Sequence, residues 1–128
     1  MDLLESIRLT MERLEGELIE QLKSKVPAAF EIGSHIMNSG GKRVRPQLCV
    51  ISARMGGYNG LDSIKLAGAI ECIHTATLLH DDVVDMADTR RGRPSANTLW
   101  SNEMCVLGGD FILAKAFSTL TSIGNLRI

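Results

Sequence analysis

The stretch IKLAGAIECIHTATLLHDDVVDM, residues 64–86, decides the fold of this chain. Its apolar residues surround nearly the whole circumference of a helix, so we expect a helix over about residues 63–86, with Asp62 or Ser63 as its N-cap. A helix that is apolar on almost every side has to lie inside the molecule. Other helices are therefore expected to pack around it.

The flanking sequence supplies such helices. We expect them over about residues 2–25, 28–37, 46–56 and 102–123. Pro27 ends the first and Gly124 ends the last, while the polar segment 87–97 forms a loop. Only 4% of the residues are aromatic, and Leu, Ile, Ala, Met, Lys and Glu are frequent, which favours helix over sheet. The predicted fold class is all-α, a helical bundle.

Composition excludes several classes of protein. Lys and Arg number 14 against 15 Asp and Glu, so no polycationic surface for nucleic acid is expected. The three cysteines are widely spaced and match neither a zinc pattern nor a disulfide framework. The first residues lack the basic start and apolar run of a signal peptide, and no run of about 18 uncharged apolar residues follows. We expect a cytoplasmic protein with no transmembrane segment.

Three carboxylates cluster near the carboxyl end of the central helix: Asp81, Asp82 and Asp85. Asp81 and Asp85 lie one turn apart on a shared face, close to the negative end of the helix dipole. Like charges at this spacing destabilise a helix, so a cation is expected there. Carboxylate oxygens suit Mg²⁺, which often bridges protein carboxylates to substrate phosphates. The alternative is a solvated acidic helix end.

Two basic clusters could bind phosphate groups. The first follows the acidic turn in a loop and consists of Arg90, Arg91 and Arg93. The second follows Gly40 and Gly41 at the start of a helix and consists of Lys42, Arg43 and Arg45. Arginine suits bidentate contact with phosphate oxygens, and a helix N-terminus also favours anions. Each cluster alone is more often a solvated surface.

His74 lies seven residues before Asp81, on the same face of the helix, where it could donate a hydrogen bond to an anion. A single helix histidine is more often a core or boundary residue. Taken together, acids suited to Mg²⁺ and two separate basic clusters indicate two diphosphate groups, one of them bridged by metal, with hydrocarbon tails in an apolar helical interior.

Three segments carry a family resemblance: GGKRVRP at 40–46, ECIHTATLLHDDVVDMADTRRGRPSAN at 71–97 and VLGGDFILAKAF at 106–117. They resemble the trans-isoprenyl (polyprenyl) diphosphate synthases, and the resemblance runs from about residue 32 to the last residue. Its most diagnostic element is D-D-x-x-D followed by R-R-G-x-P. The resemblance implies the isoprenoid synthase fold and a transferase of isoprenoid biosynthesis that condenses isopentenyl diphosphate with an allylic diphosphate.

The resemblance also implies roles for individual residues. Asp81 and Asp85 match the direct Mg²⁺ ligands, and Asp82 supports the metal site. Arg90 matches the arginine that contacts the allylic diphosphate. Arg43 has no clear counterpart. The remaining matches belong to the isopentenyl diphosphate site: Lys42, Arg45, His74 and Arg91.

The implied reaction has a physical logic. Mg²⁺ and Arg90 neutralise the charge that develops on the departing diphosphate, which lets the allylic carbon–oxygen bond break in a site shielded from water. The double bond of isopentenyl diphosphate then attacks the allylic cation, and a proton is lost. Family members with short products carry bulky aromatics four and five residues before the first aspartate. Here Thr77 and Ala76 occupy those positions, so a medium or long polyprenyl product is expected.

The family's helical domain is more than twice as long and contains a second aspartate-rich motif that this sequence lacks. We therefore expect residues 1–128 to be the N-terminal portion of a polyprenyl synthase domain, inactive alone. Exposed apolar helices, in particular the segment after Asn102, are expected to form a homodimer or to self-associate. Two alternatives are a non-catalytic diphosphate-binding or regulatory subunit of a heteromeric prenyl synthase, and a helical assembly module whose charges are merely solvated.

Overall fold

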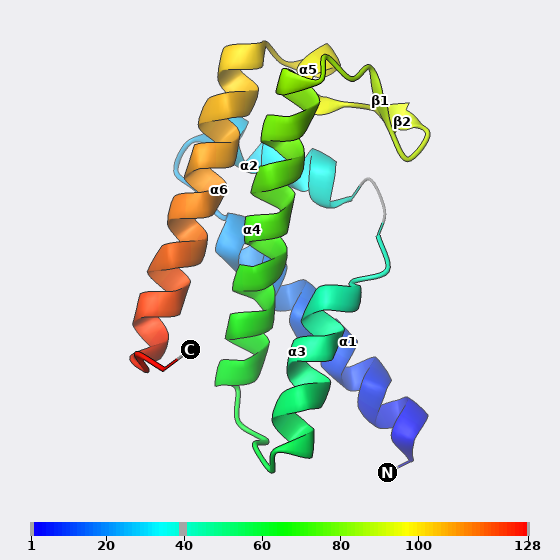
Figure 1. The fold of residues 1–128 in the computed structure, drawn as a ribbon, viewed down its shortest axis with the longest axis vertical. Helices are drawn as coiled ribbons and strands as arrows, with labels where there is room; N and C mark the ends of the chain where they lie inside the picture. Colours follow the sequence, from blue (N-terminus) through cyan, green and yellow to red (C-terminus); the bar gives the residue numbers. More distant parts are fainter. Residues whose placement is uncertain (1, 39–40, 128) are drawn as a thin grey trace.

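The computed structural model of the chain describes residues 2–38 and 41–127, and these form a helical bundle with a small hairpin at one end (Figure 1). The helices and strands, in chain order, are α1 Leu3–Leu22, α2 Pro27–Met37, α3 Val44–Met55, α4 Asp62–Val84, β1 Thr89–Arg90, β2 Arg93–Pro94, α5 Ala96–Leu99 and α6 Asn102–Ile123. The all-α prediction is confirmed. The predicted bounds of α6 are also those of the structure.

Helix α4 is the central element, as its sequence predicts. It packs against α6, α3 and α1, and Figure 1 shows α6 beside most of its length and α3 beside its lower half. The side chains on its buried faces are small or apolar: Ala67, Ala69, Cys72, Ala76 and Leu79 are almost wholly removed from solvent. Small side chains let the neighbouring helices approach α4 closely. Larger apolar residues from α1, α2 and α6 fill the rest of the core, among them Leu14, Leu18, Ile32 and Ile112.

The start of α4 differs from the prediction. Leu61 is its N-cap, and no side chain accepts a capping hydrogen bond there. The expected roles of Asp62 and Ser63 are wrong because both residues already lie inside the first turn. The hydroxyl of Tyr58 accepts from the Asp62 amide at 3.3 Å, so a residue from the preceding loop satisfies one of the free amides.

Helix α6 packs against α4 and α2 through glycines. A Cβ at Gly108 would lie 3.1 Å from Cγ2 of Ile32, and one at Gly109 would overlap Nε2 of His80. Ser101 accepts from the Met104 amide at the start of α6, and Gly124, with φ of 75°, ends the helix in the left-handed conformation.

Helix α6 is also the one helix within the described ranges that is long and apolar enough to cross a membrane, with a mean hydropathy of 1.3. Core helices of soluble proteins pass the same test of length and composition, so the finding is weak. The expected absence of a transmembrane segment stays a prediction.

The predicted loop over residues 87–97 contains regular structure that the sequence did not indicate. Strands β1 and β2 pair antiparallel, with Thr89 opposite Pro94 and Arg90 opposite Arg93. The two turn residues both have positive φ, 52° at Arg91 and 75° at Gly92, which is the geometry that closes a two-residue hairpin. Strands of two residues carry no periodic pattern, and this is why sequence reasoning missed them. The hairpin places Arg90 and Arg91 beside the second half of α4, near Asp82 and His74.

Candidate functional site

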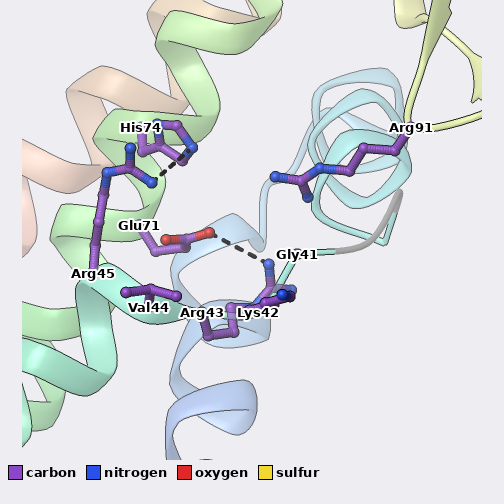
Figure 2. Close-up of a pocket in the computed structure, with 8 residues that line it drawn as sticks. All are labelled: Gly41, Lys42, Arg43, Val44, Arg45, Glu71, His74 and Arg91. Carbon is purple, nitrogen blue, oxygen red and sulfur yellow. Dashed lines mark hydrogen bonds and ion pairs between the residues drawn. The ribbon is translucent and has the colours of Figure 1, made fainter.

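A strongly basic pocket lies where the start of α3 and the hairpin turn face the middle of α4 (Figure 2). Its volume is about 410 Å³, within the range of small-molecule sites. Four of the eight lining residues are lysine or arginine. The lining comprises Gly41, Lys42, Arg43, Val44, Arg45, Glu71, His74 and Arg91. All residues matched to the isopentenyl diphosphate site thus come together in one cavity, although they belong to three separate segments of the chain.

Backbone conformation at the start of α3 explains how the basic residues reach the pocket. Gly41 has φ of 131°, and a Cβ there would lie 2.6 Å from Nη1 of Arg91. A side chain at this position would therefore collide with the arginine that crosses from the hairpin. Arg43 follows with φ of 54° and serves as the N-cap, so α3 begins at Val44 instead of at Pro46 as predicted. Pro46 is accommodated because an amide hydrogen is not needed in the first turn.

His74 is tied to the basic side of the pocket. Nη1 of Arg45 lies 3.3 Å from its Nε2, and Figure 2 shows Arg45 reaching from α3 to the imidazole on α4. Because arginine only donates, Nε2 accepts this bond and the ring proton sits on Nδ1. Burial, and then the Arg45 charge, lower the pKa of His74; Glu71 opposes this effect, and Arg91 and Arg90 add to it. The imidazole is therefore neutral at pH 7.

The acidic turn is split between two environments. Asp82 is 3% exposed and receives a bidentate pair from Arg90, with Nε donating to Oδ2 at 2.9 Å and Nη2 to Oδ1 at 2.6 Å. Asp81 and Asp85 are exposed. The Asp85 amide donates to the Asp81 carbonyl at 2.8 Å, so these two residues lie one helical turn apart, as predicted.

The carboxylates of this turn were predicted to bind Mg²⁺, and their chemistry can be compared with that prediction. Within residues 2–38 and 41–127, no group of three or more His, Cys, Asp or Glu side chains is arranged to hold a metal ion. Arg90 occupies both oxygens of Asp82, so Asp81 and Asp85 are the two donors of this turn that remain. Mg²⁺ is commonly bound by one or two carboxylates together with substrate phosphates and water. The donor set fits that mode of binding.

The three arginines of the hairpin have different partners. Arg90 pairs with Asp82, Arg91 lines the basic pocket, and Arg93 donates to the carbonyl of Asn38 at 2.7 Å. Their proximity in the sequence predicts a single run of phosphate-binding groups. The hairpin separates Arg90 from Arg91 because Arg90 ends β1, whereas Arg91 lies in the turn with a positive φ of 52°.

The two positions assigned to product length also diverge. Thr77 is exposed and its hydroxyl donates to the His74 carbonyl at 2.6 Å. It lies one turn before Asp81, on the same face of α4. Ala76 is 1% exposed and belongs to the core that α4 forms with its neighbours. Thr77 is thus the residue of the pair that borders the acidic face.

Sequence reasoning missed Glu71, the only carboxylate that lines the pocket among the described residues. Arg43, which had no clear assignment, is its ion-pair partner at 3.3 Å. A signal for Glu71 was present in the sequence: it is a lone acid within an otherwise apolar part of the central helix, three residues before His74 and so on the same face.

The chain matches known proteins over most of its length. A sequence model described as polyprenyl synthetase matches residues 26–128. The octaprenyl diphosphate synthase of Escherichia coli (strain K12) is 47% identical over 118 residues, which cover 92% of this chain and 36% of that protein. An all-trans-nonaprenyl-diphosphate synthase (geranyl-diphosphate specific) from Rhodobacter capsulatus is 41% identical over 126 residues, covering 98% of this chain and 39% of the relative.

Solved structures share the fold. A decaprenyl diphosphate synthase from Rhodobacter capsulatus superimposes with a TM-score of 0.92 at 44% identity, over 96% of this chain and 38% of that one. A polyprenyl synthase from Caulobacter crescentus CB15, complexed with calcium and isoprenyl diphosphate, gives 0.91 at 36% identity with the same coverage. The chain thus spans well under half the length of these relatives. With its isoprenoid synthase fold, its basic pocket and its acidic turn, the chain belongs to the polyprenyl synthetase family.

Proposed function

We propose that this chain forms the substrate-binding part of a Mg²⁺-dependent trans-prenyltransferase. The enzyme condenses isopentenyl diphosphate with an allylic diphosphate and gives a medium or long polyprenyl diphosphate. One observation carries the proposal: Lys42, Arg45 and Arg91, from segments far apart in the chain, converge with His74 in a single pocket. A diphosphate carries several negative charges, and convergent cations are the chemistry that recognises it.

The basic pocket holds the diphosphate of isopentenyl diphosphate in this proposal. Lys42, from the segment before α3, and Arg91, from the hairpin turn, both contribute positive charge to the cavity (Figure 2). Arg45 contributes a guanidinium whose position is fixed by its contact with His74. Because His74 accepts this bond without becoming charged, it orients Arg45 without competing for the anion.

The acidic turn and Arg90 serve the allylic diphosphate. Asp81 and Asp85 would hold Mg²⁺, which when bound draws negative charge from the diphosphate and makes it a better leaving group. Asp82 fixes Arg90 through Nε and Nη2, which leaves Nη1 to donate to a phosphate oxygen. A guanidinium held in this way needs little reorganisation as charge develops on the leaving group.

The small side chain at Thr77 supports a product longer than farnesyl. It lies one turn before Asp81 on an exposed part of α4, where a growing hydrocarbon chain leading away from the metal site would pass. The relatives named above are octaprenyl and nonaprenyl diphosphate synthases, consistent with such a product. Replacing Thr77 with Phe is expected to shorten the product of an active enzyme.

Apolar side chains on α6 support self-association. Leu107 and Phe117 are 62% and 56% exposed. Burying such a surface against a second copy removes apolar area from water, so a homodimer is the proposed assembly. A cytoplasmic location is part of the same proposal.

A complementation assay tests the function. The 128-residue chain is mixed with a separate polypeptide that supplies the remaining part of the E. coli octaprenyl diphosphate synthase, with Mg²⁺, an allylic primer and radiolabelled isopentenyl diphosphate. Labelled polyprenyl product is expected from the mixture and from neither part alone, since the acidic turn contributes only two free carboxylates.

Two variants, each of which removes one carboxylate charge, serve as test and matched control. Asp81→Asn is expected to abolish the product, whereas Asp88→Asn, an exposed acid outside the turn, should leave it unchanged. Turnover by the chain alone would contradict its proposed inactivity. Equal product from the Asp81→Asn mixture would contradict the assigned metal role.

A further inference from the structure

Arg43 lines the pocket, and each nitrogen of its guanidinium donates to a protein acceptor. Its Nε donates to Oε1 of Glu15 at 2.9 Å, its Nη1 to Oε1 of Glu71 at 3.3 Å and its Nη2 to the carbonyl of Met37 at 3.0 Å. The side chain is 10% exposed. All three guanidinium nitrogens therefore face acceptors on α1, α4 and α2, and this geometry is unsuited to direct capture of an anion.

Glu71 explains why a cation is needed at this point. It is 7% exposed and lines the pocket beside Lys42 and Arg45. A buried carboxylate in a site built for an anion repels that anion and is itself costly without a partner. Arg43 is the partner that neutralises it (Figure 2).

The backbone conformation of Arg43 indicates a second role for this residue, in positioning the neighbouring cations. It occupies the left-handed region, with φ of 54°, between the two cations that flank it in the sequence, Lys42 and Arg45. A non-glycine residue in this region persists only where its surroundings hold it there. The three hydrogen bonds of the side chain supply that hold, and they fix the start of α3, where Lys42 precedes the helix and Arg45 lies in its first turn.

We propose that Arg43 is a positioning residue of the diphosphate site: it neutralises Glu71 and fixes Lys42 and Arg45, and it does not bind the diphosphate itself. This inference rests on the proposed function. Glu71 has the opposite effect, because its negative charge repels an anion. The affinity of the pocket for an anion then depends on how far Arg43 neutralises Glu71.

The test measures binding of inorganic pyrophosphate to the 128-residue chain by titration calorimetry at pH 8. Arg43→Gln leaves Glu71 uncompensated, and the affinity is expected to fall at least about tenfold. Adding Glu71→Gln to this variant removes the uncompensated charge, and the affinity should return to within about threefold of the unsubstituted chain. If Arg43 were a ligand, the double variant would remain as weak as Arg43→Gln, which would overturn the proposal.

Two further variants distinguish a change in pyrophosphate affinity from a loss of folding. Arg8→Gln removes the same charge from an arginine that also contacts two glutamates but lies on the exposed face of α1, and it should leave pyrophosphate affinity unchanged. Glu71→Gln alone keeps an oxygen that can accept from Arg43, so the pocket retains its shape while losing a negative charge. We expect it to bind pyrophosphate about threefold more tightly. Weaker binding by a folded Glu71→Gln chain would overturn the proposal even if Arg43→Gln fails to fold.

A ligand-free readout separates this inference from the proposed function. The charged groups that act on His74 are Arg45 from α3, Glu71 from α4, and Arg90 and Arg91 from the hairpin. Freeing Glu71 by Arg43→Gln should raise the pKa of His74, measured by NMR, and the double variant should return it to the value of Glu71→Gln alone. An unchanged pKa in Arg43→Gln overturns the neutralising role. Absence of pyrophosphate binding by the unsubstituted chain, with the pKa changes present, overturns the proposed function and the positioning role while leaving the ion pair established.

Discussion

The Asp82–Arg90 pair allows a quantitative test of how the acidic turn is held. Arg90→Leu removes the guanidinium and leaves a carboxylate that is almost wholly buried without its two strong hydrogen bonds. Removing one partner of a fully buried pair typically costs about 3–5 kcal/mol, whereas an exposed pair contributes about 0–1 kcal/mol. The Arg90 side chain is 23% exposed, so the expected loss lies between these limits, at about 2–3 kcal/mol of unfolding free energy.

The assay is urea denaturation followed by the far-ultraviolet circular dichroism of the helices. Asp82→Asn in the Arg90→Leu background replaces the unpaired charge with a neutral group and should recover at least about 1 kcal/mol. Arg8→Leu is the matched control, because Arg8 pairs with Glu5 and Glu12 on an exposed helix face and its loss should leave the urea midpoint nearly unchanged. A loss below about 1 kcal/mol for Arg90→Leu, or no recovery in the double variant, would refute this account of the turn.

Three further predictions concern single positions. The folded-state pKa of His74 lies below its unfolded value, so its contribution to stability is present above the unfolded pKa and is lost as the pH falls through the folded pKa. The urea midpoint should therefore fall less steeply from pH 7 to pH 5 in the His74→Gln variant than in the unsubstituted chain. Gly41→Ala places a Cβ against Arg91 at a φ of 131°, and it should lower stability by about 1–3 kcal/mol and weaken pyrophosphate binding in calorimetry. Gly109→Ala should lower the thermal midpoint because its Cβ meets the imidazole of His80, and His80→Ala in the same chain should restore part of the loss.

The fold was largely predictable because its longest helices carry strong patterns. The continuous apolar surface of α4 indicated a central helix, and Gly124 marked the end of α6 at the observed residue. Local details that depend on tertiary contacts were not predictable. The amide of Asp62 is capped by a tyrosine from the preceding loop, and the hairpin depends on an arginine with positive φ, which no periodicity reveals.

Lys42, Arg45, His74 and Arg91 were named from the sequence, whereas Glu71 was not, and the geometry of the candidate site was only partly predictable. Helical spacing alone placed Asp81 and Asp85 one turn apart. That segments 41–45 and 90–91 face the same part of α4 came from the family resemblance, since spacing along a chain does not fix distances between separate elements. The divergence of Arg90 from Arg91 follows from the hairpin turn, where Arg91 has a positive φ.

Arg43 pairs with Glu71 because both side chains are largely removed from solvent, where a carboxylate needs a partner. Both this pair and the divergence of the hairpin arginines depend on side-chain environments that a sequence pattern does not contain.

The central claim is that the basic pocket binds a diphosphate, and calorimetric titration of pyrophosphate tests it most directly. The unsubstituted chain should bind pyrophosphate, and the Lys42→Ala and Arg45→Ala variants should each bind at least about tenfold more weakly, because each loses a charge-assisted hydrogen bond worth about 1.5–3 kcal/mol. Pyrophosphate affinity that is unaltered by both substitutions would contradict the claim.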